Sequence, residues 1–301
     1  ELVGALERAG VHVVVARPPV PREVRTFAAT DLVQAGAARR AARAALRDHR
    51  PRATIYSSLT AALLWPEPGA IRFDSPSAAN RPGRHGIWQR PVERRRLAAA
   101  PLLLPMDPAG LTEAGREGDD AVVVRVPVEP SGPPAGARDI AAMAYATNPE
   151  KKGLERMLAA WAAARAPGET LVVAGAARPA GGEGVRSVGV LPADEYRALL
   201  RRARVFFAAP AREDYGIVQL EALADGCVLV STESAGPYPA RALGRTLDPR
   251  LVGDDLAGAL RTALDDPVPG YAEQAAELLR PFSRAEVDRV VAGEVLPRLL
   301  G

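Results

Sequence analysis

The chain has 301 residues, of which 48% are hydrophobic and 25% charged, and this length suffices for two domains of about 150 residues each. Its formal net charge is only +3, which argues against a protein that binds nucleic acid through bulk electrostatics. The sequence contains no run of about 18 apolar residues, which argues against a membrane span.

The first 128 residues show the alternation of strands and helices that builds a parallel sheet. Residues 1–10 form the pattern of an amphipathic helix, and residues 11–16 (VHVVVA) that of a buried strand. A long Ala/Arg helix is expected from Asp31, as its N-cap, to about Arg50. Strands are predicted at ATIYSS, AIRF, PLLLPM and AVVVRV, with a short helix at LTAALL. Because the chain opens inside a helical pattern, the first strand of this domain is expected to be missing.

An arginine-rich segment, RPGRHGIWQRPVERRR from Arg81 to Arg96, has two interpretations. It is either a solvated helix face, which Glu93 with its flanking arginines fits, or a surface for an anionic acceptor or lipid headgroups. Most charge runs are solvated faces, which favours the first interpretation, whereas clustered arginine beside Trp88 is typical of an interfacial patch and would imply peripheral membrane contact. The candidate acceptor-side residues are Arg84, Arg90 and Arg94.

A segment rich in Pro and Gly, Val126 to Asp139, lacks apolar periodicity and is predicted to be an interdomain linker. The predicted domains are residues 1–128 and 129–283, followed by a C-terminal helix at 284–301. The second domain again alternates, with strands at DIAAMAYA, LVVAG, VRSVGVL, VFFAAP and VLVSTES and helices at LERMLAAWAAA and ADEYRALLRRA. Further helices are expected from about Asp254 to Leu264 and from Tyr271 to Leu279.

The only two lysines, Lys151 and Lys152, stand side by side among 39 basic residues, in the loop TNPEKKG between a strand and a helix. At a helix start, cations oppose the helix dipole, so an anion is needed to justify the pair. The alternative is a pair of solvated lysines. The single cysteine, Cys227, excludes an intrachain disulfide and a cysteine-based metal cluster, as expected in a reduced cytoplasm.

The stretch Ala211 to Gly226, AREDYGIVQLEALADG, follows the buried strand VFFAA and runs from a loop into a helix. Its loop is therefore placed at the carboxyl edge of a sheet, where open α/β folds bind ligands. Gly216 lets the backbone approach a ligand closely, and the first amides of the helix favour an anion such as a diphosphate. The candidate donor-binding residues of this stretch are Tyr215, Gly216, Ile217, Val218 and Glu221.

Two carboxylates, Glu213 and Glu221, flank this anion site. Carboxylates beside a diphosphate would be repelled unless each faces hydroxyl groups, which donate to an ionised carboxylate in pairs. A sugar and a ribose supply such hydroxyls. The stretch therefore points to a sugar nucleotide.

Glu213, the seven residues DYGIVQL and Glu221, followed by ALADG, resemble the EX7E signature of retaining glycosyltransferases of family 4. The resemblance is strong from Val205 to about Ala242. It implies an α/β fold of the GT-B type, with two Rossmann-like domains facing across a cleft and the C-terminal helix packing back on the first. It also implies that Glu213 contacts the transferred sugar and Glu221 the ribose of the donor.

The lysine loop is similar to the phosphate loop of that family, in which a lysine before a glycine reaches the donor diphosphate. Lys152 before Gly153 matches this pattern. The family also has an arginine at the end of the preceding strand, where this chain has Tyr145 or Ala146, and Lys151 is the candidate replacement. The family's first-domain histidine is replaced by Phe73 and Asp74, which leaves His85 as the nearby candidate for a catalytic role.

The predicted function is transfer of a sugar from a nucleotide diphosphate sugar to an unknown acceptor, anionic or lipid-linked, by a bacterial enzyme in the cytoplasm or at the inner face of the membrane. No AspXAsp pair follows a strand, so neither a metal nor a cofactor is expected. Charge on the leaving group would be met by Lys152, Lys151 and the helix amides. A nucleotide-sugar-binding module without catalysis and a GT-B-type epimerase are the alternatives.

Overall fold

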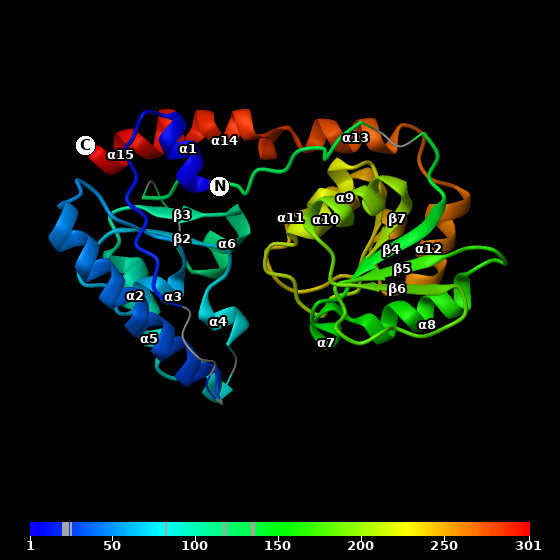
Figure 1. Cartoon of the computed structure of the whole chain (residues 1–301), viewed down its shortest axis with the longest axis horizontal. Coiled ribbons are helices and arrows are strands. Elements are labelled where there is room, and N and C mark those ends of the chain that lie inside the picture. The colour runs from blue at the N-terminus through cyan, green and yellow to red at the C-terminus, as the bar shows by residue number, and fades with distance from the viewer. Residues whose placement is uncertain (20–23, 25, 82, 117, 119, 134–135) are drawn as a thin grey trace. The chain divides into compact units, whose positions relative to one another are not determined.

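The computed structural model describes residues 1–301 except 20–23, 25, 82, 117, 119 and 134–135 (Figure 1). The side chains of Phe27 and His85 are also outside the described part. The chain divides into two compact units. One consists of Glu1–Pro127 with Arg284–Gly301, and the other of Val128–Ser283. In the described part of the chain, none of the helices combines the length and apolar character needed to cross a membrane.

The first unit is built on a parallel sheet in the order β1-β2-β3. Its strands are short, β1 at Ile55–Tyr56, β2 at Ala70–Phe73 and β3 at Leu103–Pro105. Residues 121–124 continue the sheet beside β3, because the Val122 amide donates to the Leu103 carbonyl at 2.9 Å. The strand predictions at AIRF and PLLLPM are confirmed, as is the parallel α/β class.

Helices surround this sheet and close its core. They are α1 (Leu2–Arg8), α2 (Phe27–His49), α3 (Leu59–Leu63), α4 (Ser77–Asn80), α5 (Gln89–Ala99) and α6 (Pro108–Glu113), with a 3-10 turn at Gly83–Gly86. The C-terminal segment joins the same unit through α14 (Arg284–Val290), a π-helical turn (Val291–Val295) and α15 (Leu296–Leu300). Its side chains Val287, Val291 and Val295 are buried in one cluster with Ala5 and Leu6.

Two predictions for this unit are wrong. Residues 11–16 form no strand, and Val14 and Val15 are exposed, because a strand needs a neighbour to complete its hydrogen bonds and no described strand pairs with this segment. The long helix begins after Thr26, whose hydroxyl accepts from the Ala29 amide at 3.3 Å. Asp31 lies inside that helix, where it is buried and accepts from the Gln89 amide group at 3.0 Å.

The second unit holds a five-stranded parallel sheet in the order β6-β5-β4-β7-β8. Its strands are β4 (Ile140–Tyr145), β5 (Leu171–Ala174), β6 (Val185–Gly189), β7 (Ala203–Phe207) and β8 (Val228–Val230). β4 and β5 are buried along almost their whole length, as expected where helices cover both faces of a parallel sheet. Figure 1 shows α8 below this sheet and α9 and α10 above it.

The helices of the second unit are α7 (Pro149–Lys152), α8 (Leu154–Ala164), α9 (Ala193–Arg202), α10 (Ile217–Ala224), α11 (Pro239–Leu247), α12 (Leu256–Asp265) and α13 (Tyr271–Leu278), with 3-10 turns at Pro249–Leu251 and Arg280–Phe282. The segment AGPYPARAL after β8 enters α11 at Pro239. The direction of strand addition reverses between β4 and β7. The helices that follow these two strands therefore pack on opposite faces of the sheet, and such a switch point is where open α/β sheets bind ligands.

Candidate functional site

The loops after β4 and β7 meet at Gly153, which follows the two lysines. Gly153 has φ +70°, and a Cβ at this position would lie 1.9 Å from the Ala209 carbonyl oxygen in the segment after β7. The Arg156 guanidinium also donates to that carbonyl. Only glycine combines the left-handed backbone with such a close approach, so this residue fixes the spacing of the two loops.

Lys152 and Glu213 form a buried ion pair across the two loops. The Lys152 Nζ to Glu213 Oε2 distance is 2.5 Å, and their side chains are 17% and 7% exposed. Gln219 Nε2 donates to the same oxygen at 3.3 Å. The Glu213 amide donates to the Ala235 carbonyl at 3.0 Å, which ties this residue to the segment after β8. The carboxylate and the ammonium are thus held in one geometry by several elements.

Lys151 points to a separate partner, Asp214, with a distance of 3.5 Å between Nζ and Oδ2, and its side chain is 51% exposed. Both lysines lie in the single turn of α7, directly before Gly153, which ends α7 and is the N-cap of the longer helix α8. The pair therefore lies at a helix start, but its counterions come from the protein. Glu213 and Asp214 of the chain itself are the counterions.

The N-terminus of α10 begins at Gly216, which has φ +78° and carries no side chain to cap the helix. A Cβ here would lie 2.6 Å from the ring of Tyr238, which is fully buried. Tyr238 therefore requires a glycine at this position independently of any ligand. The amides of Ile217 and Val218 belong to the first turn, whose amides have no partner within the helix. Amides of this kind at the start of a helix are available to an anion.

A cavity of ≈ 200 Å³ opens at the carboxyl ends of β4 and β5. Tyr145 and Tyr196 contribute two of its walls, and their rings pack edge to face with centroids 5.3 Å apart. Val218 and Glu221 line it from α10. The remaining lining residues are Ala174, Gly175, Val190, Leu191 and Ala193. Aromatic and apolar walls with one carboxylate suit a nucleoside, whose base is flat and whose ribose carries hydroxyls.

Burial raises the pKa of the Glu221 carboxyl, while the nearby Arg197 guanidinium lowers it and the Asp225 carboxylate raises it further. Arg197 NH1 lies 3.4 Å from Glu221 Oε1. Arg197 is thus the cation that opposes the effect of burial on the pKa of this carboxyl. This arginine was not identified as a site residue, because the sequence contains arginine throughout.

The acceptor-side candidates all belong to the first unit. Arg84 and Arg94 are exposed, whereas Arg90 closes the 3-10 turn by donating to the Gly83 carbonyl at 2.6 Å. The His85 side chain lies outside the described residues. Glu93 does not belong to a solvated face: it is buried, its carboxylate accepts from the Ser77 amide at 2.8 Å, and burial raises its pKa.

Sequence reasoning also missed Gln219, Tyr196 and Tyr238. Gln219 lies inside the seven-residue spacer, in the first turn of the helix that follows Gly216. A residue at that position can reach back to Glu213, so this contact could have been expected from the sequence. The two tyrosines reach the site from other elements, and no local pattern indicates such contacts.

Comparison with known proteins supports the interpretation of the second unit. Residues 137–266 match the family of glycosyl transferases group 1. No curated protein sequence matches the chain. Among solved structures, the chain is similar to the apo form of the lipopolysaccharide outer core galactosyltransferase WaaB, with 14% identity and a TM-score of 0.60, over 88% of this chain and 80% of that one.

Two further structures contain nucleotide or sugar. The chain resembles the E. coli trehalose-6-phosphate protein bound with UDP-2-fluoro glucose at 13% identity and a TM-score of 0.67, covering 90% of this chain and 77% of that one. It resembles Anabaena HepE in complex with UDP and glucose at 15% identity and a TM-score of 0.60, covering 79% and 74% of the two chains. At these identities the similarity establishes the fold. The chain thus has the α/β fold of GT-B glycosyltransferases, and its glycosyl transferases group 1 domain at residues 137–266 identifies it as a glycosyltransferase.

Proposed function

We propose that the chain is a retaining, metal-independent glycosyltransferase of family 4 that uses a nucleotide diphosphate sugar as donor. The observation that carries this proposal is the Lys152 to Glu213 contact of 2.5 Å at the sheet's switch point. Glu213 stands three residues before Gly216, the N-cap of α10, and Val218 and Glu221 of the same helix line the cavity. The spacer between Glu213 and Glu221 is then the EX7E spacer, with one glutamate on either side of the anion site.

In the proposed complex the nucleoside occupies the cavity and its ribose hydroxyls donate to Glu221. The diphosphate lies at the first amides of α10, on Ile217 and Val218, with Lys152 beside it. The sugar then extends toward Glu213. The UDP-2-fluoro glucose of the E. coli protein and the UDP and glucose of HepE are ligands of the same chemical class in the same fold.

The bond that breaks joins the anomeric carbon of the sugar to the diphosphate oxygen, and its electron pair leaves with the diphosphate. The incoming hydroxyl attacks from the face that the diphosphate leaves, so the configuration is retained and the hydroxyl proton passes to the departing phosphate oxygen. Lys152 and the α10 amides stabilise the charge that grows there. Because the Glu213 carboxylate already holds the Lys152 ammonium in place, little reorganisation is needed during the reaction.

We propose that the acceptor binds on the first unit, where the exposed guanidinium groups of Arg84 and Arg94 suit an anionic or lipid-linked acceptor. Arg90 is engaged by two backbone carbonyls of its own turn, those of Gly83 and Gly86, which leaves less of its guanidinium for a ligand.

A thermal-shift series with UDP, GDP, ADP and their glucose conjugates tests donor binding. A nucleotide at 100 times its Kd should stabilise the protein by about 2.7 kcal/mol. Glu213→Gln should then lower kcat more than donor affinity, because Glu213 faces the part of the donor that changes, whereas Glu221→Gln should mainly raise the donor KM. Equal effects of both substitutions on KM alone would contradict the assignment.

Release of sugar from the donor without acceptor separates the candidate activities. A transferase should leak slowly to water, a binding module should leave the donor intact, and an epimerase should return a changed nucleotide sugar. Full activity after exhaustive treatment with EDTA is expected, and loss of activity that Mg²⁺ or Mn²⁺ restores would refute the metal-independent mechanism.

A further inference from the structure

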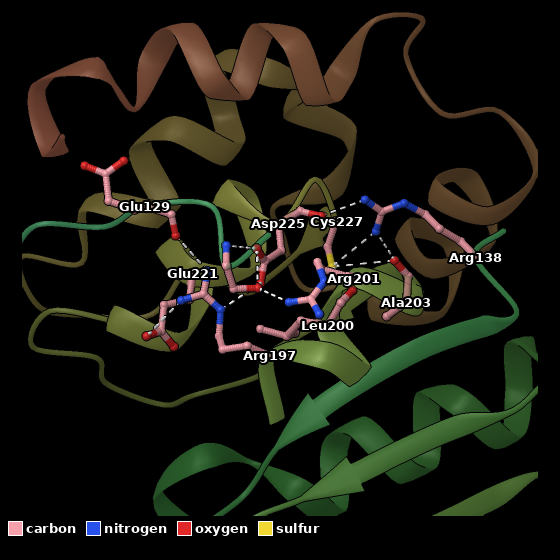
Figure 2. Close-up of polar contacts among 10 residues, drawn as sticks. Glu129, Arg138, Arg197, Leu200, Arg201, Ala203, Glu221, Asp225 and Cys227 are labelled. Atoms are coloured by element: carbon pink, nitrogen blue, oxygen red, sulfur yellow. Dashed lines mark hydrogen bonds and ion pairs between the residues drawn. The ribbon is translucent and has the colours of Figure 1, made fainter. Parts of the chain in front are cut away.

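A polar network joins α9, α10 and the first residues of the second unit, and it includes Glu221 of the cavity wall (Figure 2). At its centre is Asp225, which follows the last residue of α10 and whose side chain is fully buried. Asp225 Oδ1 accepts from the Ser131 amide at 2.7 Å, and Oδ2 accepts from Arg197 Nε at 2.7 Å. The Ser131 hydroxyl lies 2.9 Å from Oδ2. This carboxylate is therefore held by several partners.

Arg197 uses each part of its guanidinium for a different partner. Nε donates to Asp225, and NH2 donates to the Glu129 carbonyl at 2.9 Å. NH1 lies 3.4 Å from Glu221 Oε1, and the Arg197 side chain is only 15% exposed. Since the guanidinium is planar and rigid, two fixed partners determine where the third nitrogen points. In Figure 2 the head group lies between Glu221 and Asp225.

The third partner, Glu221, lies at the cavity wall. One of its oxygens faces the Arg197 guanidinium, so this contact bears on the orientation of the carboxylate. Partial burial raises the pKa of Glu221 and the Arg197 guanidinium opposes that shift, and an ionised carboxylate accepts stronger hydrogen bonds than a neutral carboxyl.

We propose that Arg197 is a positioning residue for donor recognition: anchored by Asp225 and the Glu129 carbonyl, it fixes the Glu221 carboxylate so that ribose hydroxyls can donate to it in the cavity. This inference rests on the proposed function, because it requires a ribose at the cavity wall. On this inference Arg197 does not touch the donor itself, yet it determines how well Glu221 contacts the donor's ribose.

Arg201 supplies a matched control. It lies one helical turn further along α9, carries the same charge and joins the same network, because its NH1 donates to the Ser131 hydroxyl at 2.5 Å. Among the described contacts it makes none with Glu221. Arg201→Gln therefore removes a guanidinium from the network without removing the contact that the inference depends on.

The test is calorimetric titration of UDP, GDP and ADP and of their 2′,3′-dideoxy forms into each variant. The wild type should bind the ribose form of its preferred nucleotide roughly 10-fold to 100-fold more tightly than the dideoxy form, as expected for hydrogen bonds to a charged group. Arg197→Gln should lose about tenfold in affinity for the ribose form and almost none for the dideoxy form. Arg201→Gln should keep the wild-type ratio.

A purely structural role for Arg197 would weaken both forms of the nucleotide equally, so an unchanged ratio in Arg197→Gln would overturn the inference while leaving the proposed function intact. Adding Arg197→Gln to Glu221→Gln should cause no further loss of affinity for the ribose form, since the two residues act through one contact. An additive loss would also overturn it. If the wild type bound none of the three nucleotides, the proposed function would fail and the inference with it.

Discussion

Replacing Lys152 by alanine tests the site most directly, because the structure predicts two separable losses. The first is catalytic: the variant lacks one preorganised cation at the leaving diphosphate, which should reduce turnover by a factor of roughly 10² to 10³. The second is structural. Glu213, 7% exposed, would keep a buried carboxylate whose remaining side-chain partner is the Gln219 amide at 3.3 Å.

Breaking a buried ion pair from one side costs about 3 kcal/mol or more, because the other charge stays buried without its partner. For a unit of this size each kcal/mol lowers the unfolding midpoint by about 2–4 °C, so Lys152→Ala should lower the midpoint of the second unit by about 6–12 °C. Lys151→Ala is the matched control. Its side chain is 51% exposed and 3.5 Å from Asp214, so less than about 1 kcal/mol is expected.

The assays are turnover at saturating donor and the thermal unfolding midpoint, measured on the same preparations. The double variant Lys152→Ala with Glu213→Gln should recover much of the lost stability, because it leaves no unpaired charge, yet it should remain as inactive as either single variant. Full turnover in Lys152→Ala at saturating donor would show that the diphosphate is held elsewhere. A double variant less stable than Lys152→Ala would refute the ion-pair reasoning.

Three further predictions concern the rest of the chain. Gly216→Ala should destabilise the second unit by about 1–3 kcal/mol or more, because the backbone is left-handed and a Cβ would clash with the buried Tyr238 ring. Gly181→Ala is the control, since open space surrounds it, and its unfolding midpoint should be nearly unchanged. Equal midpoints for the two variants would contradict this reasoning. Burial raises the pKa of Cys227 to about 12, so a thiol reagent at pH 8 should modify it only after unfolding, and rapid labelling of the native protein would show that the thiol is accessible. Replacing Arg94 and Arg95 by Gln should leave nucleotide binding intact and weaken binding of an anionic acceptor or of anionic liposomes, most strongly at low salt, and no change in either would identify them as a solvated face.

Arg96 is left out of that last variant because the structure gives it another role. Its guanidinium lies over the Trp65 ring at 4.9 Å from the centroid and donates to the Leu63 carbonyl at 3.0 Å. Replacing it would therefore disturb packing in the first unit as well as surface charge.

Local patterns in the sequence predicted those helices, strands and loops that can be recognised without their neighbours in the fold. The strand, loop and helix around Gly216 and the lysines before Gly153 were predicted because turn chemistry and hydrophobic periodicity are short-range. The strand prediction for residues 11–16 failed because pairing is long-range: a β-like composition does not supply a neighbouring strand. The N-cap prediction at Asp31 failed because this residue, although a good capping type, lies inside a helix that begins after Thr26.

The contacts that organise the candidate site are long-range. Lys152 and Glu213 lie 61 residues apart in the sequence, and the Asp225 network draws on the linker at Ser131, 94 residues away. The sequence could place each of these residues on its own element but could not pair them. Glu93 shows the same limit, because a single glutamate among exposed arginines gives no indication that it is buried and accepts from the Ser77 amide.

The division of the chain also has a consequence for its synthesis. Apolar residues of the C-terminal segment, Val287, Val291 and Val295, complete the core of the first unit, although the second unit lies between that segment and Pro127. At 5–20 residues per second the ribosome needs roughly 8–30 s to pass from one part to the other. During that time the second unit, which is continuous in sequence, can fold on its own, whereas the first still exposes Leu6 and its neighbours. We therefore expect the usual order of folding during translation to be reversed, with the nascent first unit as the binding target for chaperones.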